Sequence, residues 1–403
     1  MISLISRTLR SEGRSLFTPP SSLISIRHYK VLSIETSCDD TCVALLDRDP
    51  ISDKVEVLSH VKRTLNSYGD GGIIPTKAFD NHQRQIASVT KEVLQQNGIT
   101  SLNPPDLICV TRGPGMKGSL TIGLDFAKGL SVAFDKPLVG VHHMLGHLLI
   151  PRLDRNIDVQ YPFLSLLISG GHTMLVLSES IFKHEILCDT IDVACGDALD
   201  KVAREVGMEG ETNLGREMDL FLKDIDSFKG NQDLPQYSFD MPLPLMNKRG
   251  RVNQLNFAFG AFQGRVQEIK KANPELINDL NFRKQLAYQA QCAIFNHITN
   301  KLKLTLELNK DKLSQVTHFV ASGGVASNLT LRQTLTDTLL ENSNITKTHY
   351  PPVELCTDNA VMIGWAGIEM YESGEHLTTE LGVCPIGKWP ISEILDVDGW
   401  IRK

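Results

Sequence analysis

The sequence of 403 residues predicts an α/β protein with a duplicated architecture, because one strand–turn–strand plan occurs twice. An apolar run at 31–35 enters an acidic turn and leaves it as a second strand-like run at 41–46. The same plan returns at 161–177, where the turn holds Gly170-Gly171. The length allows two domains with sizeable cores, one for each half.

The elements after the first hairpin alternate between strands and helices. A strand over 106–111 ends at Gly113-Pro-Gly115, and a helix follows. Further apolar strands are predicted over 161–169, 174–177 and 316–321. The helix after the first Gly turn is amphipathic, with one apolar face formed by Leu120, Leu124, Ala127 and Leu130.

A longer helix is predicted over 284–308, where an apolar residue recurs every four positions at Leu286, Ala290, Ile294, Ile298 and Leu302. That stripe indicates a face turned to the core. The last strand enters Gly323-Gly324, a turn that we expect to open a helix. The polar, proline-bearing segment 220–256 is typical of a long insertion or loop.

Composition limits the possible functions. Hydrophobic residues make up 41% and charged residues 22%, as in an ordinary globular protein, and the longest apolar runs fall short of a membrane span. The net charge of −6 excludes a uniformly basic nucleic-acid coat but allows a local basic patch. The eight cysteines are scattered without a C-x-x-C pair, which favours reduced thiols over a disulfide framework.

Residues 1–29 differ from the rest of the chain. The first 30 residues carry five basic side chains and one acid, are rich in serine and include Pro19-Pro20. This composition is typical of a mitochondrial transit peptide, with a disordered basic tail as the alternative. We therefore expect mitochondrial localisation and exclude 1–29 from the fold.

His143 and His147 are the first candidate metal ligands, because residues four apart rise from one face of a helix. Neutral imidazoles at this spacing hold divalent metals in other proteins, although such pairs also occur by chance in amphipathic helices. The zinc-protease signature H-E-x-x-H has a Glu where this chain has Met144. The pair therefore indicates a metal and argues against a metalloprotease.

Three glycine turns follow apolar strands, at Gly113/Gly115, Gly170-Gly171 and Gly323-Gly324. Glycine allows a ligand to approach the backbone closely, so three such turns favour a nucleotide cleft between two lobes. The carboxylates placed to serve that cleft are Asp39, Asp40, Asp197, Asp200, Asp219 and Asp358. Each of these taken alone is more often a helix cap or a solvated charge.

Taken together, motifs spread from Leu32 to Trp389 closely resemble the threonylcarbamoyltransferase family that modifies tRNA, once labelled glycoprotease. The motifs that carry the resemblance are Glu35-Thr-Ser-Cys-Asp-Asp40, Gly71-Gly-Ile-Ile-Pro75, Gly113-Pro-Gly115 with Gly118-Ser-Leu120, His143-x-x-x-His147, Ser169-Gly-Gly-His-Thr173, Ala198-Leu-Asp-Lys-Val-Ala-Arg204, Ser322-Gly-Gly-Val-Ala-Ser-Asn328 and Cys356-Thr-Asp-Asn359. The resemblance implies a two-lobed actin-like ATPase or sugar-kinase fold around a nucleotide cleft. It places the N-terminal lobe at 30–142 plus 358–403 and the C-terminal lobe at 143–357.

The resemblance also implies a reaction. A metal-dependent acyltransferase would move the threonylcarbamoyl group from threonylcarbamoyl-AMP to the exocyclic amine of the adenosine 3′ to the anticodon. Its substrates would be mitochondrial tRNAs that read ANN codons, and AMP would be released. The implied partners are tRNA and the adenylate, with AMP or ATP in the cleft, and we expect a homodimer in the matrix and no membrane association.

The family pattern assigns site residues as well. His143, His147 and Asp358 correspond to the ligands of one divalent metal ion, for which zinc or iron is expected. The substrate and nucleotide contacts correspond to Leu167, Ile168, Ser169, Gly170, Gly171, Asp200, Gly215, Asp219 and Asn328. No side-chain nucleophile is implied, and Cys38 and Cys195 are more simply interpreted as small buried side chains.

The chain departs from the family pattern at several positions, none of them a metal ligand. Thr76 and Leu145 stand where the family often has Glu, and the turn before Asp219 reads Asn213-Leu-Gly215-Arg216. A basic patch for tRNA is proposed at Lys248, Arg249, Arg251, Arg265, Lys270 and Lys271. A nucleotide-binding assembly factor without chemistry remains the alternative function, and a metalloprotease the disfavoured one.

Overall fold

The computed structural model describes residues 28–67, 72–154, 157–210, 214–247, 250–251 and 254–402. Nearly all of the predicted transit peptide therefore lies outside the described residues. Strand β1 starts at Tyr29, the last residue of the predicted transit peptide. The hydroxyl of Tyr29 donates a hydrogen bond of 2.7 Å to Glu372, which ties the first strand to a residue 343 positions further along the chain.

The first sheet has five strands in the order β3-β2-β1-β4-β5. These are β1 (Tyr29–Glu35), β2 (Asp40–Asp49), β3 (Lys54–Thr64), β4 (Leu107–Gly113) and β5 (Leu138–His142). β2 pairs antiparallel with β1 and β3, whereas β4 pairs parallel with β1 and β5. The confirmed hairpin β1–β2 thus opens a mixed sheet.

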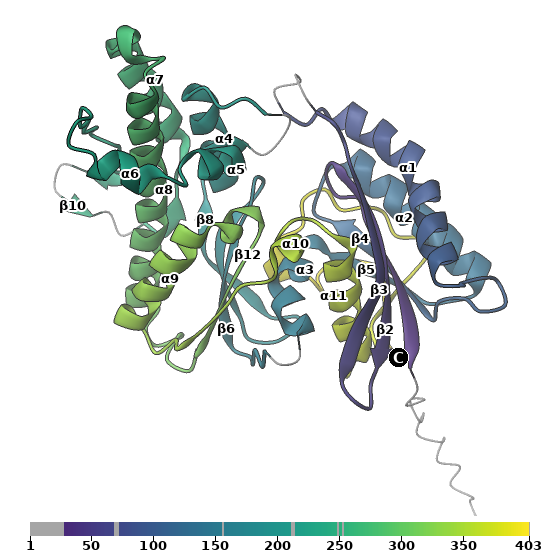
Figure 1. The fold of residues 1–403 in the computed structure, drawn as a ribbon. Coiled ribbons are helices and arrows are strands. Elements are labelled where there is room, and N and C mark those ends of the chain that lie inside the picture. Colours follow the sequence, from purple (N-terminus) through teal and green to yellow (C-terminus); the bar gives the residue numbers. More distant parts are fainter. Residues whose placement is uncertain are drawn as a thin grey trace, which may run out of the picture.

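Helices α1 (Pro75–Gln96) and α2 (Lys117–Phe134) cover one face of this sheet (Figure 1). Side chains alternate between the two faces of a strand, so Leu32 and Ile34 of β1 pack in the cluster that holds Leu124 and Ala127 of α2. Val31 points the other way, into the cluster between the two sheets. The predicted apolar face of α2 is therefore a core face.

The second sheet repeats the first and adds one strand, in the order β11-β8-β7-β6-β12-β13. Its strands are β6 (Phe163–Ile168), β7 (Thr173–Ser178), β8 (His184–Thr190), β11 (Asn256–Phe257), β12 (His318–Ser322) and β13 (Lys347–His349). β6, β7 and β8 are antiparallel neighbours, and β12 runs parallel to β6 and β13. Three antiparallel strands followed by two parallel ones occur in both sheets, which confirms the predicted duplicated, actin-like α/β fold.

Helices of the second half surround the second sheet. They are α4 (Cys195–Glu205), α5 (Leu214–Phe221), α6 (Ile225–Gly230), α7 (Gly260–Ala272), α8 (Leu280–Leu308) and α9 (Leu329–Asn342). α8 begins four residues before the predicted start, because the Asp279 carboxylate caps it by accepting from Phe282 N at 2.7 Å. The five residues of its predicted apolar stripe are all buried.

The segment 220–256 is less irregular than predicted. It contains the end of α5, all of α6, the short strands β9 (Met246–Asn247) and β10 (Gly250–Arg251) and the start of β11. Ile225 anchors α6 in the core of the second half, a contact that a window of polar residues conceals. The stretch 231–245 fits the predicted loop.

Two further helices, α3 (His143–Leu149) and α11 (Ala360–Glu372), lie between the sheets, and the short α10 (Val353–Cys356) lies beside them (Figure 1). Leu145 and Leu148 of α3 share one apolar cluster with Trp365 of α11 and with Phe163 and Val176 of the second sheet. The chain thus crosses between the halves on buried helices. The domain boundaries at 142/143 and 357/358 stay a prediction. In the described part of the chain, no helix is long and apolar enough to span a membrane.

Candidate metal and substrate site

Helix N-termini hold the first and last of the three predicted metal ligands. His143 begins α3 directly after β5, and the ring of His142 caps this helix by accepting from Met144 N at 3.1 Å. Burial lowers the pKa of His142 to about 3, which keeps the ring neutral and able to accept. Asp358 precedes α11, whose cap Asn359 accepts from Met362 N at 2.8 Å.

Gly146 allows α3 and α11 to approach closely. A Cβ at this position would lie 2.9 Å from Met362 Cγ and 3.2 Å from Ile363 Cδ1 of α11. Because glycine lacks that atom, the helices pack close enough for His147, one residue further along α3, to reach Asp358. The glycine inside the His143–His147 motif therefore serves the site through packing.

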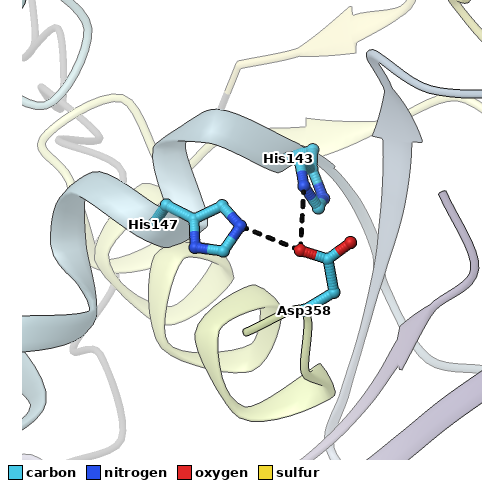
Figure 2. Close-up of side chains that lie close together, drawn as sticks. All are labelled: His143, His147 and Asp358. Atoms are coloured by element: carbon cyan, nitrogen blue, oxygen red, sulfur yellow. Dashed lines mark hydrogen bonds and ion pairs between the residues drawn. The ribbon is translucent and has the colours of Figure 1, made fainter. Parts of the chain in front are cut away.

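The three predicted ligands converge, as Figure 2 shows. Asp358 Oδ1 lies 3.1 Å from His147 Nε2 and 3.5 Å from His143 Nε2, and the three ligand atoms lie within 4.8 Å of one another. Nitrogen and oxygen ligands at the usual 2.0–2.2 Å from a tetrahedral zinc are separated by about 3.3 Å, so the donor set and its spacing fit a divalent ion. Three protein ligands leave coordination positions open for a substrate.

Within the triad, a proton on the His143 ring offsets the negative charge of Asp358. Burial would lower the pKa of His143, but the carboxylates of Asp358 and Glu35 outweigh burial and raise it to about 10. Burial would likewise raise the pKa of Asp358, but His143 and His147 hold it well below its ordinary value. A divalent cation would take the place of the proton that His143 Nε2 holds against Asp358.

Glu35 lies directly behind His143, although the sequence analysis names it only as the first residue of a family motif and not as a site residue. It ends β1 with a fully buried side chain, and its Oε2 lies 3.2 Å from His143 Nδ1. Thr111 Oγ1 donates to the same oxygen, and Ser37 N donates to Oε1 at 2.5 Å. A charged residue closing the apolar strand Val31–Ile34 was the only local signal.

Strand β3 holds the loop that carries Asp358. Lys62 Nζ donates to the backbone oxygen of Asp358 at 3.0 Å and forms an ion pair with Asp40. His60 Nε2 accepts from Ala360 N at 3.4 Å. The acidic turn after β1 thus acts on the site through Lys62, so that the predicted role of Asp40 becomes a supporting one.

The remaining acids that were predicted to serve the cleft differ in their environment. Burial, with Asp40 and Asp358 nearby, raises the pKa of Asp39 to about 6, so Asp39 lies in the electrostatic field of the site. Asp197 instead forms an ion pair of 2.8 Å with Lys201 on its own helix. Asp197 is thus a partly exposed, paired charge, and its service to the cleft stays a prediction.

The predicted substrate loop ends β6. Leu167 and Ile168 are buried in the sheet, whereas Gly170 and Gly171 are exposed, and an added Cβ at either glycine would meet nothing within 4 Å. Ser169 Oγ accepts from Gly171 N and His172 N, which fixes the turn. Only the turn itself is therefore accessible to a ligand, and Leu167 and Ile168 would act through their backbone.

Neighbouring segments converge on this loop. Gly196 N donates to Ser169 O at 3.0 Å, and a Cβ at Gly196 would lie 2.7 Å from that same oxygen. A Cβ at Gly324 would lie 3.8 Å from Thr357 Cγ2, next to the predicted metal ligand Asp358. The charge of the triad acts on His172, because burial and then His143 lower the pKa of His172 to about 4. The loop and the triad therefore lie close together.

The four predicted nucleotide residues form two bonded pairs. Asp200 Oδ1 accepts from Gly215 N at 2.6 Å. Asp219 Oδ1 accepts from Asn328 Nδ2 at 2.7 Å and from Gln291 Nε2 at 2.6 Å. Burial raises the pKa of both carboxyls. The structure thus brings these residues together in pairs, and their contact with a nucleotide stays a prediction.

The proposed tRNA patch is only partly described. Lys248 and Arg249 lie outside the described residues. Lys270 forms an ion pair of 3.0 Å with Glu205, and Arg265 donates to Asp240 O and to Glu268. These partners neutralise part of the charge, so the described half of the patch offers less to a phosphate backbone than its sequence suggests.

Known proteins resemble this chain over most of its length. A family model described as tRNA N6-adenosine threonylcarbamoyltransferase matches residues 55–365. The mitochondrial tRNA N6-adenosine threonylcarbamoyltransferase of Schizosaccharomyces pombe is 39% identical over 391 residues, which covers 95% of this chain and 91% of that protein. The tRNA N6-adenosine threonylcarbamoyltransferase of Borrelia duttonii is 35% identical over 349 residues, covering 85% and 92%.

A solved structure, that of T. kodakarensis HypF, aligns with 85% of this chain and 48% of that chain. The TM-score is 0.49 and the sequence identity is 14%. This likeness is too remote to bear on function, which leaves the sequence relatives and the family match as the informative comparisons.

Proposed function

Because the chain belongs to the tRNA N6-adenosine threonylcarbamoyltransferase family, we propose that it transfers threonylcarbamoyl from its adenylate to tRNA at the site of His143, His147 and Asp358. The acceptor is the exocyclic amine of the adenosine 3′ to the anticodon in mitochondrial tRNAs that read ANN codons. The observation that carries the proposal is the convergence of three ligand atoms within 4.8 Å, next to an exposed glycine turn. Zinc and iron both suit two imidazoles and one carboxylate.

The proposed step is a direct acyl transfer. The amine nitrogen bonds to the carbamoyl carbon, the bond from that carbon to the phosphate oxygen breaks, and AMP leaves with the electron pair while the amine loses a proton to solvent. A divalent ion held by His143, His147 and Asp358 would supply Lewis-acid polarisation of the carbonyl. Gly170 and Gly171 leave the turn open to the adenylate, and Ser169 Oγ fixes this turn by accepting from Gly171 N and His172 N.

Reconstitution tests this function. Purified protein, threonylcarbamoyl-AMP and unmodified tRNA are incubated together. The nucleosides of the tRNA are then separated and identified by mass spectrometry. We expect threonylcarbamoyladenosine in the complete reaction and none without donor. If the protein binds AMP but yields no modified nucleoside from the supplied donor, a non-catalytic nucleotide-binding role replaces the proposal. Chelator-sensitive cleavage of a peptide would favour a protease.

We further propose that the protein works as a homodimer in the mitochondrial matrix. The basic, serine-rich segment 1–29 and the similarity to a mitochondrial relative support the location. Sedimentation analysis of the purified protein tests the dimer, with a single species of 44.7 kDa as the opposing result. Fractionation of cells that express the full chain tests the location, and a cytosolic product of unchanged length would oppose it.

A further inference from the structure

The two histidine ligands differ in what lies behind them. His143 Nδ1 lies 3.2 Å from Glu35 Oε2 and 3.2 Å from Ser37 Oγ. His147 Nδ1 is buried, and among the described residues it has no hydrogen-bond partner. The His143 ring therefore has a polar partner at both of its nitrogens, whereas the His147 ring has one at Nε2 alone.

Glu35 itself is fixed in place by donors. Ser37 N donates to Oε1 at 2.5 Å, and Thr111 Oγ1 donates to Oε2. The side chain has no exposed surface, and the register of β1 against β4, where Ile34 pairs with Val110, places Thr111 beside it. A fully buried carboxylate with two fixed donors is a rigid acceptor for a third donor.

The tautomer of His143 follows from this arrangement. A carboxylate accepts hydrogen bonds and cannot donate them, so Nδ1 of His143 must carry a proton towards Glu35. Nε2, which faces Asp358 at 3.5 Å, is then the nitrogen that can bind a metal. A carboxylate behind a ligating imidazole orients the ring and raises its basicity.

We propose that Glu35 is a positioning residue that sets His143 as an Nε2 ligand and thereby tunes metal affinity. The inference rests on the proposed metal site. It also gives a reason for the first residue of the motif Glu35-Thr-Ser-Cys-Asp-Asp40, since the strand of one sheet supplies the acceptor for a ligand on the helix between the two sheets. Glu35 touches neither substrate nor metal in this account.

Glu35→Gln gives a sharp test because the backbone dictates how the amide lies. Ser37 N requires an acceptor, so the Gln carbonyl takes the place of Oε1 and the NH₂ group turns towards His143. The NH₂ group donates to Nδ1, which moves the ring proton to Nε2 and blocks the ligand position. We expect the Zn²⁺ affinity, measured by chelator competition, to fall by about 10- to 100-fold.

Thr111→Val is the matched control. It changes the same buried cluster and removes one donor to Glu35, but it leaves the carboxylate on His143. Its Zn²⁺ affinity should stay within about threefold of wild type. Thermal unfolding of each metal-free protein separates loss of stability from loss of affinity. If Glu35→Gln is folded and binds Zn²⁺ as wild type does, the proposal is wrong.

A second measurement does not depend on how the variants fold. In the Zn²⁺-bound wild-type protein, long-range ¹H–¹⁵N spectra of histidine rings should show His143 protonated at Nδ1 and metallated at Nε2. The reverse assignment would overturn the role of Glu35 even if the metal binds. If wild type binds neither Zn²⁺ nor Co²⁺, the metal site of the proposed function fails instead, and the two failures are thus distinguishable.

Discussion

Gly323 lies against the backbone of Ile168, so that a Cβ at Gly323 would come within 2.3 Å of the Ile168 oxygen and 2.7 Å of its carbonyl carbon. Gly323 also has φ +102, a conformation that L side chains rarely adopt. The turn after β12 and the substrate loop after β6 can therefore meet only through a glycine.

Gly323→Ala should lower the free energy of unfolding by at least about 2 kcal/mol, because both the clash and the backbone conformation oppose a side chain. Gly324→Ala is the control at the adjacent position, since its nearest atom would be Thr357 Cγ2 at 3.8 Å. We expect that variant to lie within about 0.5 kcal/mol of wild type. Urea titrations measure both, and equal stabilities would contradict the packing described.

Lys62→Met should weaken metal binding by about tenfold, because Lys62 holds the backbone of Asp358 and not its carboxylate. Lys62→Arg keeps the charge opposite Asp40 and should retain most of the affinity. Competition with a chelator for Zn²⁺ measures the effect. Wild-type affinity in Lys62→Met would show that the loop before α11 is held by other contacts, such as that of His60.

Stability should fall with acid through His184. Its buried ring donates to Ile181 O at 3.0 Å and accepts from Ser178 Oγ at 2.9 Å, and burial lowers its pKa to about 4. The unfolded chain takes up this proton below pH 6.5, whereas the folded chain does so only near pH 4. Roughly 3 kcal/mol of stability is therefore lost between those two pH values on account of this ring.

His184→Gln removes the titrating group and keeps a donor for Ile181 O. The unfolding free energy of this variant is measured in urea between pH 7 and pH 4.5. It should fall with decreasing pH less steeply than that of wild type, and the difference in slope should correspond to the uptake of up to one proton. Above pH 7 the two slopes should coincide, because the wild-type ring is neutral in both states there. Parallel curves below pH 6 would rule out the assignment to His184.

Local sequence patterns predicted the elements whose formation depends on residues close together in the sequence. The apolar stripe of Leu286 to Leu302 gave α8, and the repeated hairpin gave the duplicated sheets. The pattern placed the start of α8 late, because the Asp279 cap lies outside the apolar repeat. Polar composition concealed α6, whose only buried residue is Ile225.

The site was predictable only in part, because its contacts are distant in sequence. His143 and His147 share a helical spacing, but Asp358 lies 211 residues beyond His147 and was assigned through family resemblance alone. Glu35 and His143 are 108 residues apart, and neither position carries a local pattern that names the other. The Glu35–His143 pair appears only when the strand order β1-β4-β5 is known, because His143 directly follows β5.

We propose above that the triad at the start of α3 and α11 performs the transfer. The most direct measurement is the initial rate of threonylcarbamoyladenosine formation by Asp358→Ala, with the adenylate supplied and the fold checked by circular dichroism. We expect a loss of at least about 100-fold, or some 3 kcal/mol of transition-state stabilisation. Asp197→Ala, which removes a carboxylate outside the triad that pairs with Lys201, should keep most of the wild-type rate. If a folded Asp358→Ala protein modifies tRNA at the wild-type rate, the triad does not perform the transfer.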